Sequence, residues 1–185
     1  LIESAGTDFL ITIDTHRHRV LKASDVLSIP CLDVSAIPAL ARYASSAQHL
    51  QNPLVVAPDA EAEHWAKLAA DALKTDYKVF EKKRLSAGTV EIGPKKVDVG
   101  KREVLIVDDI ISTGGTIVEV VRTLNRLGAS KIVASCTHPI LVENALSRIQ
   151  SEGLAAVIAT DTVPSPVSHV SVAPLVAQVL RETQL

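Results

Sequence analysis

The sequence has few of the residues that mark secreted, disulfide-stabilised or membrane-spanning proteins. It contains two cysteines, no methionine and only 3% aromatic residues. Cys31 and Cys136 each lie in an apolar stretch, which is typical of small buried side chains and does not suggest a disulfide framework. The printed residues show no run of eighteen apolar positions and no signal-peptide pattern, so we predict a cytoplasmic protein without a membrane segment.

An excess of charge of either sign is also missing. The 19 basic and 21 acidic residues leave a net charge of −2, which predicts no general attraction to nucleic acid or to an anionic membrane. A site for an anionic ligand must therefore be built locally from basic side chains and backbone N–H groups. The 47% of hydrophobic residues in a chain of 185 is typical of a globular protein with a sizeable core.

The first residues resemble the end of an element rather than its beginning. Leu1 to Ala5 has the pattern of a last helical turn, Gly6 is a plausible C-cap, and a strand follows directly. Together with the missing methionine, this pattern leads us to interpret the chain as a piece of a longer protein.

Short apolar runs rich in Val and Ile alternate with longer segments of helical periodicity. Continuous runs of this kind are typical of strands buried on both faces of a parallel sheet. The predicted strands are Phe9–Ile13, Pro53–Ala57, Tyr77–Phe80, Val104–Val107, Lys131–Ser135 and Ala155–Ala159. The predicted helices are Ile37–Ala47, Glu61–Leu73, Gly115–Leu127, Leu141–Gln150 and Pro174–Thr183. This alternation predicts an α/β fold with a mostly parallel, Rossmann-like sheet flanked by helices.

Two segments interrupt the alternation. Lys82–Gly100 is rich in Lys, Gly, Ser and Pro, and we predict a mobile flap with a weak strand near Thr89–Ile92. Asp161–Ser168 holds hydroxyl residues and prolines, which predicts a loop.

The motif that carries chemistry follows the buried strand Val104–Val107 and precedes a helix. In open α/β sheets, ligands bind at the carboxyl ends of strands. Asp108 and Asp109 can accept hydrogen bonds from vicinal sugar hydroxyls or help hold a hydrated cation. The small residues after them let backbone N–H groups, hydroxyls and the helix dipole hold a phosphate. We therefore predict a ribose-phosphate site made of these two acids with Ser112, Thr113, Gly114, Gly115 and Thr116.

Val104–Thr116 resembles the loop that binds phosphoribosyl pyrophosphate (PRPP) in phosphoribosyltransferases and in PRPP synthetases, the ribose-phosphate diphosphokinases. The form Ile-Ile-Ser-Thr-Gly-Gly-Thr is most similar to archaeal synthetases. Many bacterial synthetases carry a third Asp where this chain has Ser112. The loop alone does not separate the two families, because both bind the same ribose phosphate.

Other segments resemble the synthetases in order and spacing over essentially the whole chain. Ile11–His16 is similar to a synthetase strand ending in Asp-x-His, and Val55–Ala60 is similar to its Ser-Pro-Asp-Ala segment. Phe80–Arg84 is similar to the start of its catalytic flexible loop. Shorter similarities lie at Ile29–Pro30, Asp33, Ser35, Thr137–His138, Thr160–Thr162 and Ser171–Leu175. Glu61 and Ala62 replace two glycines that are typical of that family.

The resemblance implies a phosphoribosyltransferase-type fold and transfer of the diphosphoryl group of ATP to ribose 5-phosphate, giving PRPP and AMP. It implies that His16 and Asp59 hold the Mg²⁺ of Mg-ATP, and that Lys82 and Arg84 contact ATP and act in catalysis. It also implies three parts: residues 1–32 as the end of an N-terminal half, 33–168 as the ribose-phosphate domain, and 169–185 as a returning helix. Uncovered apolar surface at the missing half favours a homo-oligomer.

Simpler interpretations remain open for individual residues. His16 could belong to a solvated basic turn with Arg17–Arg19, Asp59 could cap the next helix, and Lys82–Arg84 could be ordinary charged surface. We interpret the remaining candidates as structural or surface groups: His49, His64, Trp65 and His169. For the whole protein, the alternatives are a phosphoribosyltransferase that consumes PRPP and a non-catalytic regulator of PRPP synthesis.

Overall fold

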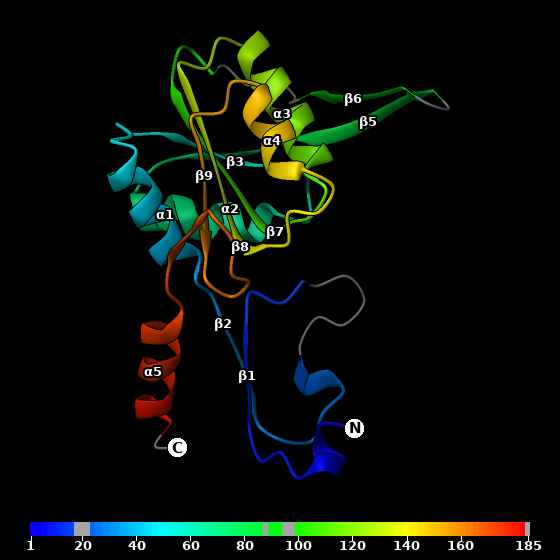
Figure 1. Ribbon diagram of the computed structural model, residues 1–185, viewed down its shortest axis with the longest axis vertical. Helices are drawn as coiled ribbons and strands as arrows, with labels where there is room; N and C mark the ends of the chain where they lie inside the picture. Colours follow the sequence, from blue (N-terminus) through cyan, green and yellow to red (C-terminus); the bar gives the residue numbers. More distant parts are fainter. Residues whose placement is uncertain (17–22, 87–88, 94–98, 184–185) are drawn as a thin grey trace.

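The computed structural model describes residues 1–16, 23–86, 89–93 and 99–183, and for 81–86 and 89–93 the backbone alone. Its centre is a six-stranded, fully parallel sheet in the order β10-β9-β8-β7-β3-β4 (Figure 1). In that order the strands are Ser168–Val170, Ala156–Thr160, Lys131–Pro139, Glu103–Ile111, Leu54–Ala57 and Tyr77–Val79. The parallel α/β fold predicted from the sequence is confirmed.

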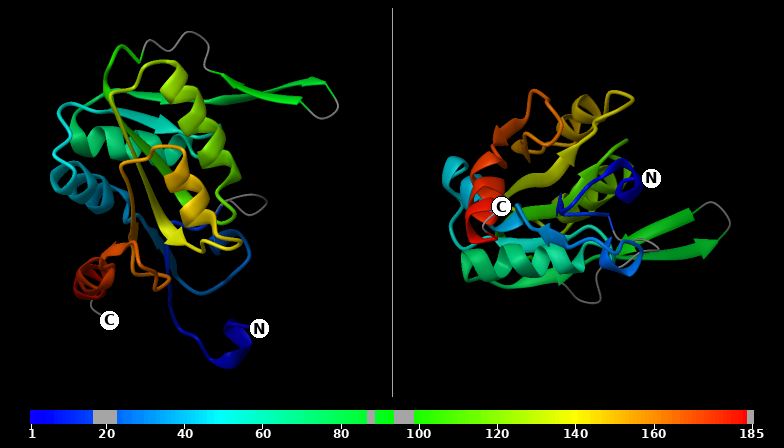
Figure 2. Two further views of the ribbon diagram at one scale, coloured as in Figure 1. Left: turned by 45° about the horizontal axis from the view of Figure 1, so that its top comes forward. Right: turned by 90° about the horizontal axis from the view of Figure 1, so that it is seen from below.

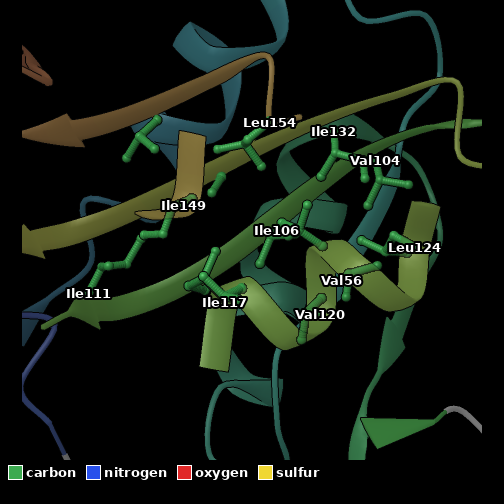
Figure 3. Close-up of a cluster of buried hydrophobic side chains, with 14 of the residues drawn as sticks. Val56, Val104, Ile106, Ile111, Ile117, Val120, Leu124, Ile132, Ile149 and Leu154 are labelled. Carbon is green, nitrogen blue, oxygen red and sulfur yellow. The ribbon is translucent and has the colours of Figure 1, made fainter. Parts of the chain in front are cut away.

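Helices cover both faces of this sheet. Helices α1 (Ile37–Ala47) and α2 (Glu63–Leu73) pack on one face, and α3 (Gly115–Arg126) and α4 (Ala145–Ser151) pack on the other. Because side chains alternate along a strand, β7 serves both layers. Its Val104 and Ile106 pack toward α3 and α4 (Figure 3), whereas Leu105 and Val107 pack toward α1 and α2. The apolar run of β7 is therefore the shared centre of two cores.

A smaller unit adjoins one end of the main sheet. Strands β1 (Leu10–Ile13) and β2 (Cys31–Val34) form a parallel pair, and helix α5 (Ala173–Glu182) lies nearby at the same end, as do both chain termini (Figure 1). Short 3-10 helices occupy Glu3–Ala5 and Ala23–Asp25. Gly6 has φ 86° and closes the first of these, as expected for a C-cap.

The segment predicted as a flap contains an antiparallel hairpin. Strand β5 (Glu81–Ser86) pairs with β6 (Thr89–Gly93), and the hairpin projects from the body of the molecule (Figure 2). The predicted weak strand near Thr89–Ile92 is therefore confirmed, whereas β5 was missed. Residues 87–88 and 94–98 of the predicted flap lie outside the described part of the chain.

The structure also corrects several boundaries. Strand β7 continues through Asp108 and Asp109 to Ile111, and β8 continues to Pro139, because the two strands pair along this whole length. Helix α4 does not begin at Leu141. Residues 141, 143 and 144 have positive φ, and the N–H of Leu141 donates to the carbonyl of Ile111 at 3.0 Å instead of starting a helix. Two further strands, β2 and β10, were also missed.

The described residues contain no helix that is both long and apolar enough to cross a bilayer. The division of the chain after residue 32 stays a prediction, and β2 spans that point.

Candidate active site

Two adjoining cavities lie at the carboxyl end of the parallel sheet. The larger, of about 590 Å³, is lined by six of the residues predicted from the sequence: His16, Asp59, Asp108, Asp109, Ser112 and Thr116. The smaller, of about 160 Å³, is formed by Asp108 and the backbone turn from Ile110 to Ile117, which holds the rest of the predicted phosphate loop. The structure thus brings segments far apart in the sequence to one place.

The smaller cavity has the form of an anion cradle. Gly114 has φ 75° and is the N-cap of α3, so the turn reverses directly into the helix. A Cβ built on Gly114 would lie 2.7 Å from Cδ1 of Ile149, which means that α4 packs against this turn too closely for a side chain. The first turn of α3 points its N–H groups and positive dipole end toward the loop, an arrangement suited to phosphate.

The two adjacent carboxylates have different surroundings. Asp109 is 4% exposed, its Oδ1 accepts the N–H of Ile110 at 2.8 Å, and its Oδ2 contacts His16. Asp108 is half-buried, lines both cavities and accepts the N–H of Asp109 at 3.0 Å. Burial raises the pKa of Asp108 well above its usual range, and the charges of Asp109 and Asp59 raise it further. A hydroxyl donor or a cation in the cavity would therefore stabilise the charged form of the Asp108 carboxylate.

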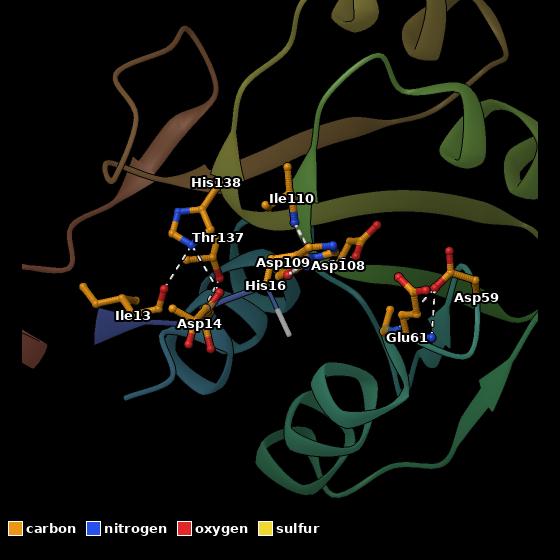
Figure 4. A network of polar contacts seen from close by, with 12 residues as sticks. Ile13, Asp14, His16, Asp59, Glu61, Asp108, Asp109, Ile110, Thr137 and His138 are labelled. Carbon is orange, nitrogen blue, oxygen red and sulfur yellow. Dashed lines mark hydrogen bonds and ion pairs between the residues drawn. The ribbon is translucent and has the colours of Figure 1, made fainter. Parts of the chain in front are cut away.

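His16 reaches the cavity from the end of β1. Its Nδ1 lies 2.8 Å from Oδ2 of Asp109, while 45% of the His16 side chain remains exposed (Figure 4). A carboxylate can only accept, so Nδ1 carries hydrogen and donates it. A neutral ring then has its lone pair on Nε2. The alternative interpretation, that His16 belongs to a solvated basic turn, does not account for the contact of its ring with Asp109. The other residues of that turn, Arg17–Arg19, lie outside the described residues.

Asp59 follows β3 and lies across the cavity from His16 (Figure 4). Its Oδ1 accepts the N–H groups of Glu61 at 3.1 Å and Ala62 at 3.3 Å, which caps the turn leading into α2. These bonds belong to the turn before α2. The N-cap of the helix itself is Ala62, with no side-chain cap hydrogen bond, so the interpretation of Asp59 as the helix cap is wrong. The role of Asp59 as a ligand of Mg²⁺ stays a prediction, and the same side chain lines the larger cavity. The negative charge of Asp59 also raises the pKa of Asp108.

Four residues that the sequence analysis did not select for the site also line the larger cavity: Glu61, His64, Trp65 and Ile110. Glu61 lies in the turn before α2, and His64 and Trp65 lie in the first turn of that helix, three and four positions further on. His64 and Trp65 contact each other in a T-shaped arrangement with ring centroids 4.8 Å apart. Trp65 is 4% exposed and belongs to the core, so its structural interpretation holds, but it is also cavity wall. The spacing of Glu61, His64 and Trp65 after Asp59 was the sequence signal that could have placed these three residues at the cavity.

Lys82 and Arg84 lie on β5, where they pair with Ile92 and Val90 of β6. Their side chains lie outside the described part of the structure, so their predicted roles in catalysis and ATP binding stay predictions.

The profile of the phosphoribosyl transferase domain family matches residues 34–172, which include α1 to α4 and the whole six-stranded sheet. The chain belongs to this family. Two ribose-phosphate pyrophosphokinases are similar over almost all of it. The protein from Methanopyrus kandleri is 45% identical over 95% of this chain, and the one from Methanothermobacter thermautotrophicus is 41% identical over 98%. This chain covers 59% and 62% of those relatives, respectively, and so spans about three fifths of their length.

Solved structures agree with this assignment. The phosphoribosylpyrophosphate synthetase from Mycobacterium smegmatis has a TM-score of 0.80 and 26% identity, covering 99% of this chain and 61% of that one. An adenine phosphoribosyl transferase from Trypanosoma brucei has a TM-score of 0.52 and 13% identity over 77% of this chain and 76% of that one, a likeness in fold alone. Within the phosphoribosyl transferase domain, Asp59, Asp108, Asp109 and the loop 112–116 lie inside the matched range, whereas His16 comes from the segment before it.

Proposed function

We propose that this chain is the ribose-phosphate-binding and catalytic part of a ribose-phosphate diphosphokinase. The protein would transfer the diphosphoryl group of ATP to the 1-hydroxyl of ribose 5-phosphate, giving PRPP and AMP. The proposal rests on the cavity together with the similarity to ribose-phosphate pyrophosphokinases over nearly the whole chain.

One observation carries the proposal: His16, which precedes the phosphoribosyl transferase domain, is hydrogen-bonded to Asp109 inside that domain's cavity. A domain that only recognises ribose phosphate needs the loop and the acids. An additional nitrogen ligand placed over them is useful for a second, cation-bearing substrate. The larger cavity, of about 590 Å³, offers a volume typical of small-molecule sites.

In this proposal, ribose 5-phosphate occupies the smaller cavity and its mouth. Its phosphate lies on Ser112, Thr113, Gly114, Gly115 and Thr116 at the start of α3. The vicinal hydroxyls donate to Asp108 and Asp109. Asp108 is the stronger candidate of the two, since both oxygens of Asp109 already have protein partners.

The donor atoms fit Mg²⁺ that arrives with the nucleotide rather than Mg²⁺ held by the protein alone. Within the described residues, no group of three or more His, Cys, Asp or Glu side chains is arranged to hold a metal ion. Mg²⁺ commonly takes one or two protein ligands and completes its shell with phosphate oxygens and water. His16 and Asp59 would be those ligands. When bound, Mg²⁺ neutralises charge on the transferred phosphoryl groups.

The reaction needs no covalent bond between the protein and a substrate. The 1-oxygen of ribose forms a bond to the β-phosphorus of ATP and releases its hydroxyl proton to water. The bond from that phosphorus to the α,β-bridging oxygen breaks, and AMP leaves with that oxygen. Asp108 and Asp109 fix the sugar so that the attacking oxygen stays in line. Lys82 and Arg84, on the hairpin β5–β6, would approach the transferred group and stabilise its charge.

The test is AMP formation from ATP and Mg²⁺, with and without ribose 5-phosphate. It should use this chain and the full-length product of its gene, with a Lys82→Ala variant of each. We expect AMP only when ribose 5-phosphate is present, and a rate at least about a hundredfold lower in the variant. AMP that forms without ribose 5-phosphate, or no AMP from any form, contradicts the proposal.

The competing functions give different products in the same assay. A phosphoribosyltransferase releases pyrophosphate from PRPP only when a base is added, and it releases no AMP from ATP. A non-catalytic regulator retains binding of ribose 5-phosphate but has no turnover in the full-length protein. The oligomeric state is separable from both and is measured by light scattering on the full-length protein.

A further inference from the structure

We propose that Asp14, Thr137, His138 and Thr162 form a clamp, called here the β1 clamp, that positions His16 over the active site. The clamp joins the end of β1 to the carboxyl ends of β8 and β9, two strands of the main sheet. The part played by His16 rests on the proposed function. The hydrogen bonds of the clamp stand on the structure independently.

Asp14 is the centre of the clamp. It is fully buried, with an exposed fraction of 0%. Its Oδ2 accepts the hydroxyl of Thr137 at 2.7 Å and the N–H of Ala36 at 2.9 Å, at the N-cap of α1. The carboxylate thus ties the end of β1 both to β8 and to the positive end of a helix dipole.

His138 holds the same point of the chain from the other side (Figure 4). Its Nε2 lies 3.0 Å from the carbonyl of Ile13 and 3.3 Å from that of Asp14. Carbonyl oxygens only accept, so Nε2 must carry the hydrogen. The other nitrogen, Nδ1, lies 2.9 Å from Oγ1 of Thr162, which fixes the plane of the ring. Side chain and main chain at the end of β1 are therefore both held by neighbouring residues of β8.

The backbone at Asp14 explains why such a hold is needed. Asp14 has φ 44°, in the left-handed region that non-glycine residues rarely adopt. This turn directs the chain from β1 toward the cavity, and only two residues later His16 reaches Asp109 at 2.8 Å. A left-handed residue costs free energy, and it persists when surrounding contacts fix it. Loosening the clamp should therefore displace His16 before it affects the phosphate loop.

The two hydrogen bonds of the Asp14 side chain in the clamp both go to Oδ2, so they require one acceptor oxygen at that place. Oδ1 of Asp14 is buried and meets no hydrogen-bond partner at normal distance within the described residues, although the Ser35 hydroxyl contributes to its polar surroundings. Asn could therefore keep its carbonyl oxygen at the place of Oδ2, and Asn also tolerates the left-handed backbone. We expect Asp14→Asn to retain kcat/KM for Mg-ATP within about threefold, and Asp14→Gly to lose about tenfold or more.

The main test removes one donor of the clamp in the full-length protein. Thr137→Val keeps the shape of the side chain and loses its hydroxyl, whereas Thr137→Ser restores the donor. Ser135→Ala is the matched control, because Ser135 is a buried hydroxyl on the same strand that donates to the carbonyl of Ile106 at 3.2 Å, outside the clamp. All three variants should be compared in thermal stability, in kinetics and in amide exchange.

For Thr137→Val we expect a KM for Mg-ATP raised about tenfold with a KM for ribose 5-phosphate changed less than about twofold. Amide exchange should become about tenfold faster in residues 13–16 and stay unchanged in residues 112–118. Thr137→Ser should reverse both changes, and Ser135→Ala should show neither. Thr137→Val behaving like Ser135→Ala, Thr137→Ser failing to restore, or Asp14→Asn being as damaging as Asp14→Gly would each overturn the clamp.

The two proposals fail in different ways. If the full-length protein releases no AMP, the proposed function is wrong, and amide exchange of residues 13–16 still decides whether the clamp exists. If AMP forms normally while Thr137→Val changes neither exchange nor the KM for Mg-ATP, only the clamp is wrong.

Discussion

Nδ1 of His16 lies 2.8 Å from Oδ2 of Asp109, although 93 positions separate the two residues in the sequence. The contact crosses from the segment before the phosphoribosyl transferase domain into the floor of its cavity. It links the residue proposed to hold the nucleotide's cation with an acid proposed to hold the ribose. Asp109 thus orients the ring of His16 by accepting from one nitrogen, as carboxylates commonly do beside cation-binding histidines.

The distal nitrogen of His16 should matter more than the contact with Asp109. Asn at position 16 can place an amide N–H near the position of Nδ1, so His16→Asn keeps a donor to Asp109 and lacks Nε2. We expect both His16→Asn and His16→Ala to raise the KM for Mg-ATP about ten- to a hundredfold, with nearly unchanged affinity for ribose 5-phosphate. Steady-state kinetics and calorimetric titration with ribose 5-phosphate provide the measurements. Full activity of His16→Asn would show that Nε2 has no part in the reaction.

Asp108→Asn should stabilise the fold and weaken the site. The pKa of Asp108 is raised by burial and by Asp109, so the folded state disfavours its charged form. The favourable contribution of Asp108 is therefore present below its unfolded pKa and is lost as pH rises through the raised folded pKa. Relative to the wild type, we expect the variant to gain about 1 kcal/mol in the free energy of unfolding at pH 7, and less at pH 4. Urea unfolding at both pH values measures this, and ribose 5-phosphate affinity should fall at least tenfold.

Gly114 should tolerate no side chain. Gly114→Ala adds a Cβ at 2.7 Å from Cδ1 of Ile149, in a residue with φ 75°. Gly128→Ala is the control for backbone strain alone, since Gly128 has φ 82° and an added Cβ meets nothing within 4 Å. We expect Gly128→Ala to cost about 1 kcal/mol and Gly114→Ala about 2–4 kcal/mol, by chemical denaturation.

The clash, not the strain, should account for the difference at Gly114. Ile149→Val removes the nearest atom, so the double variant Gly114→Ala with Ile149→Val should recover part of the excess loss. Equal costs of Gly114→Ala and Gly128→Ala would mean that α4 moves away without penalty.

The ion pair between Asp76 and Arg102 should make a small contribution to the free energy of unfolding that is lost at acid pH. Two guanidinium nitrogens of Arg102 contact the Asp76 carboxylate at 2.5 and 2.9 Å. The hydrogen bond from Arg102 lowers the pKa of Asp76, so its contribution is present above the unfolded value and is lost as pH falls through the folded pKa. Because the Asp76 side chain is 53% exposed, solvent reduces the effect to below about 1 kcal/mol.

Arg102→Gln tests this pair. The variant should be less stable than the wild type at pH 6, and the difference should shrink toward pH 3. A difference that does not change with pH would assign the role of Arg102 to packing or to its bond with the carbonyl of Asn52.

Much of the fold could be predicted because its signals are local. The apolar run at Val104–Val107 predicted a strand buried on both faces, and β7 indeed lies between the two cores. The turn Ser112–Thr116 was predicted as a phosphate loop because small residues between a buried strand and a helix let backbone N–H groups approach a phosphate closely. The prediction missed three short strands, β2, β5 and β10, and it misplaced boundaries that are set by partners elsewhere in the chain. Strand β7 extends past Asp108 because β8 continues to pair with it, and the local sequence near Asp108 does not predict this pairing.

The sequence by itself determined the α/β alternation, the strand–turn–helix motif from which the ribose-phosphate loop is predicted, and the resemblance to diphosphokinases, because each depends on residues close together in the chain. Tertiary structure alone decided that His16 contacts Asp109, that Asp14 is held by Thr137, and that Trp65 is both core and cavity wall. These arrangements depend on where distant segments end after packing. The local pattern around His16 suits a solvated turn or a residue of the cavity, and only the packed position of β1 against β8 brings the His16 ring to Asp109.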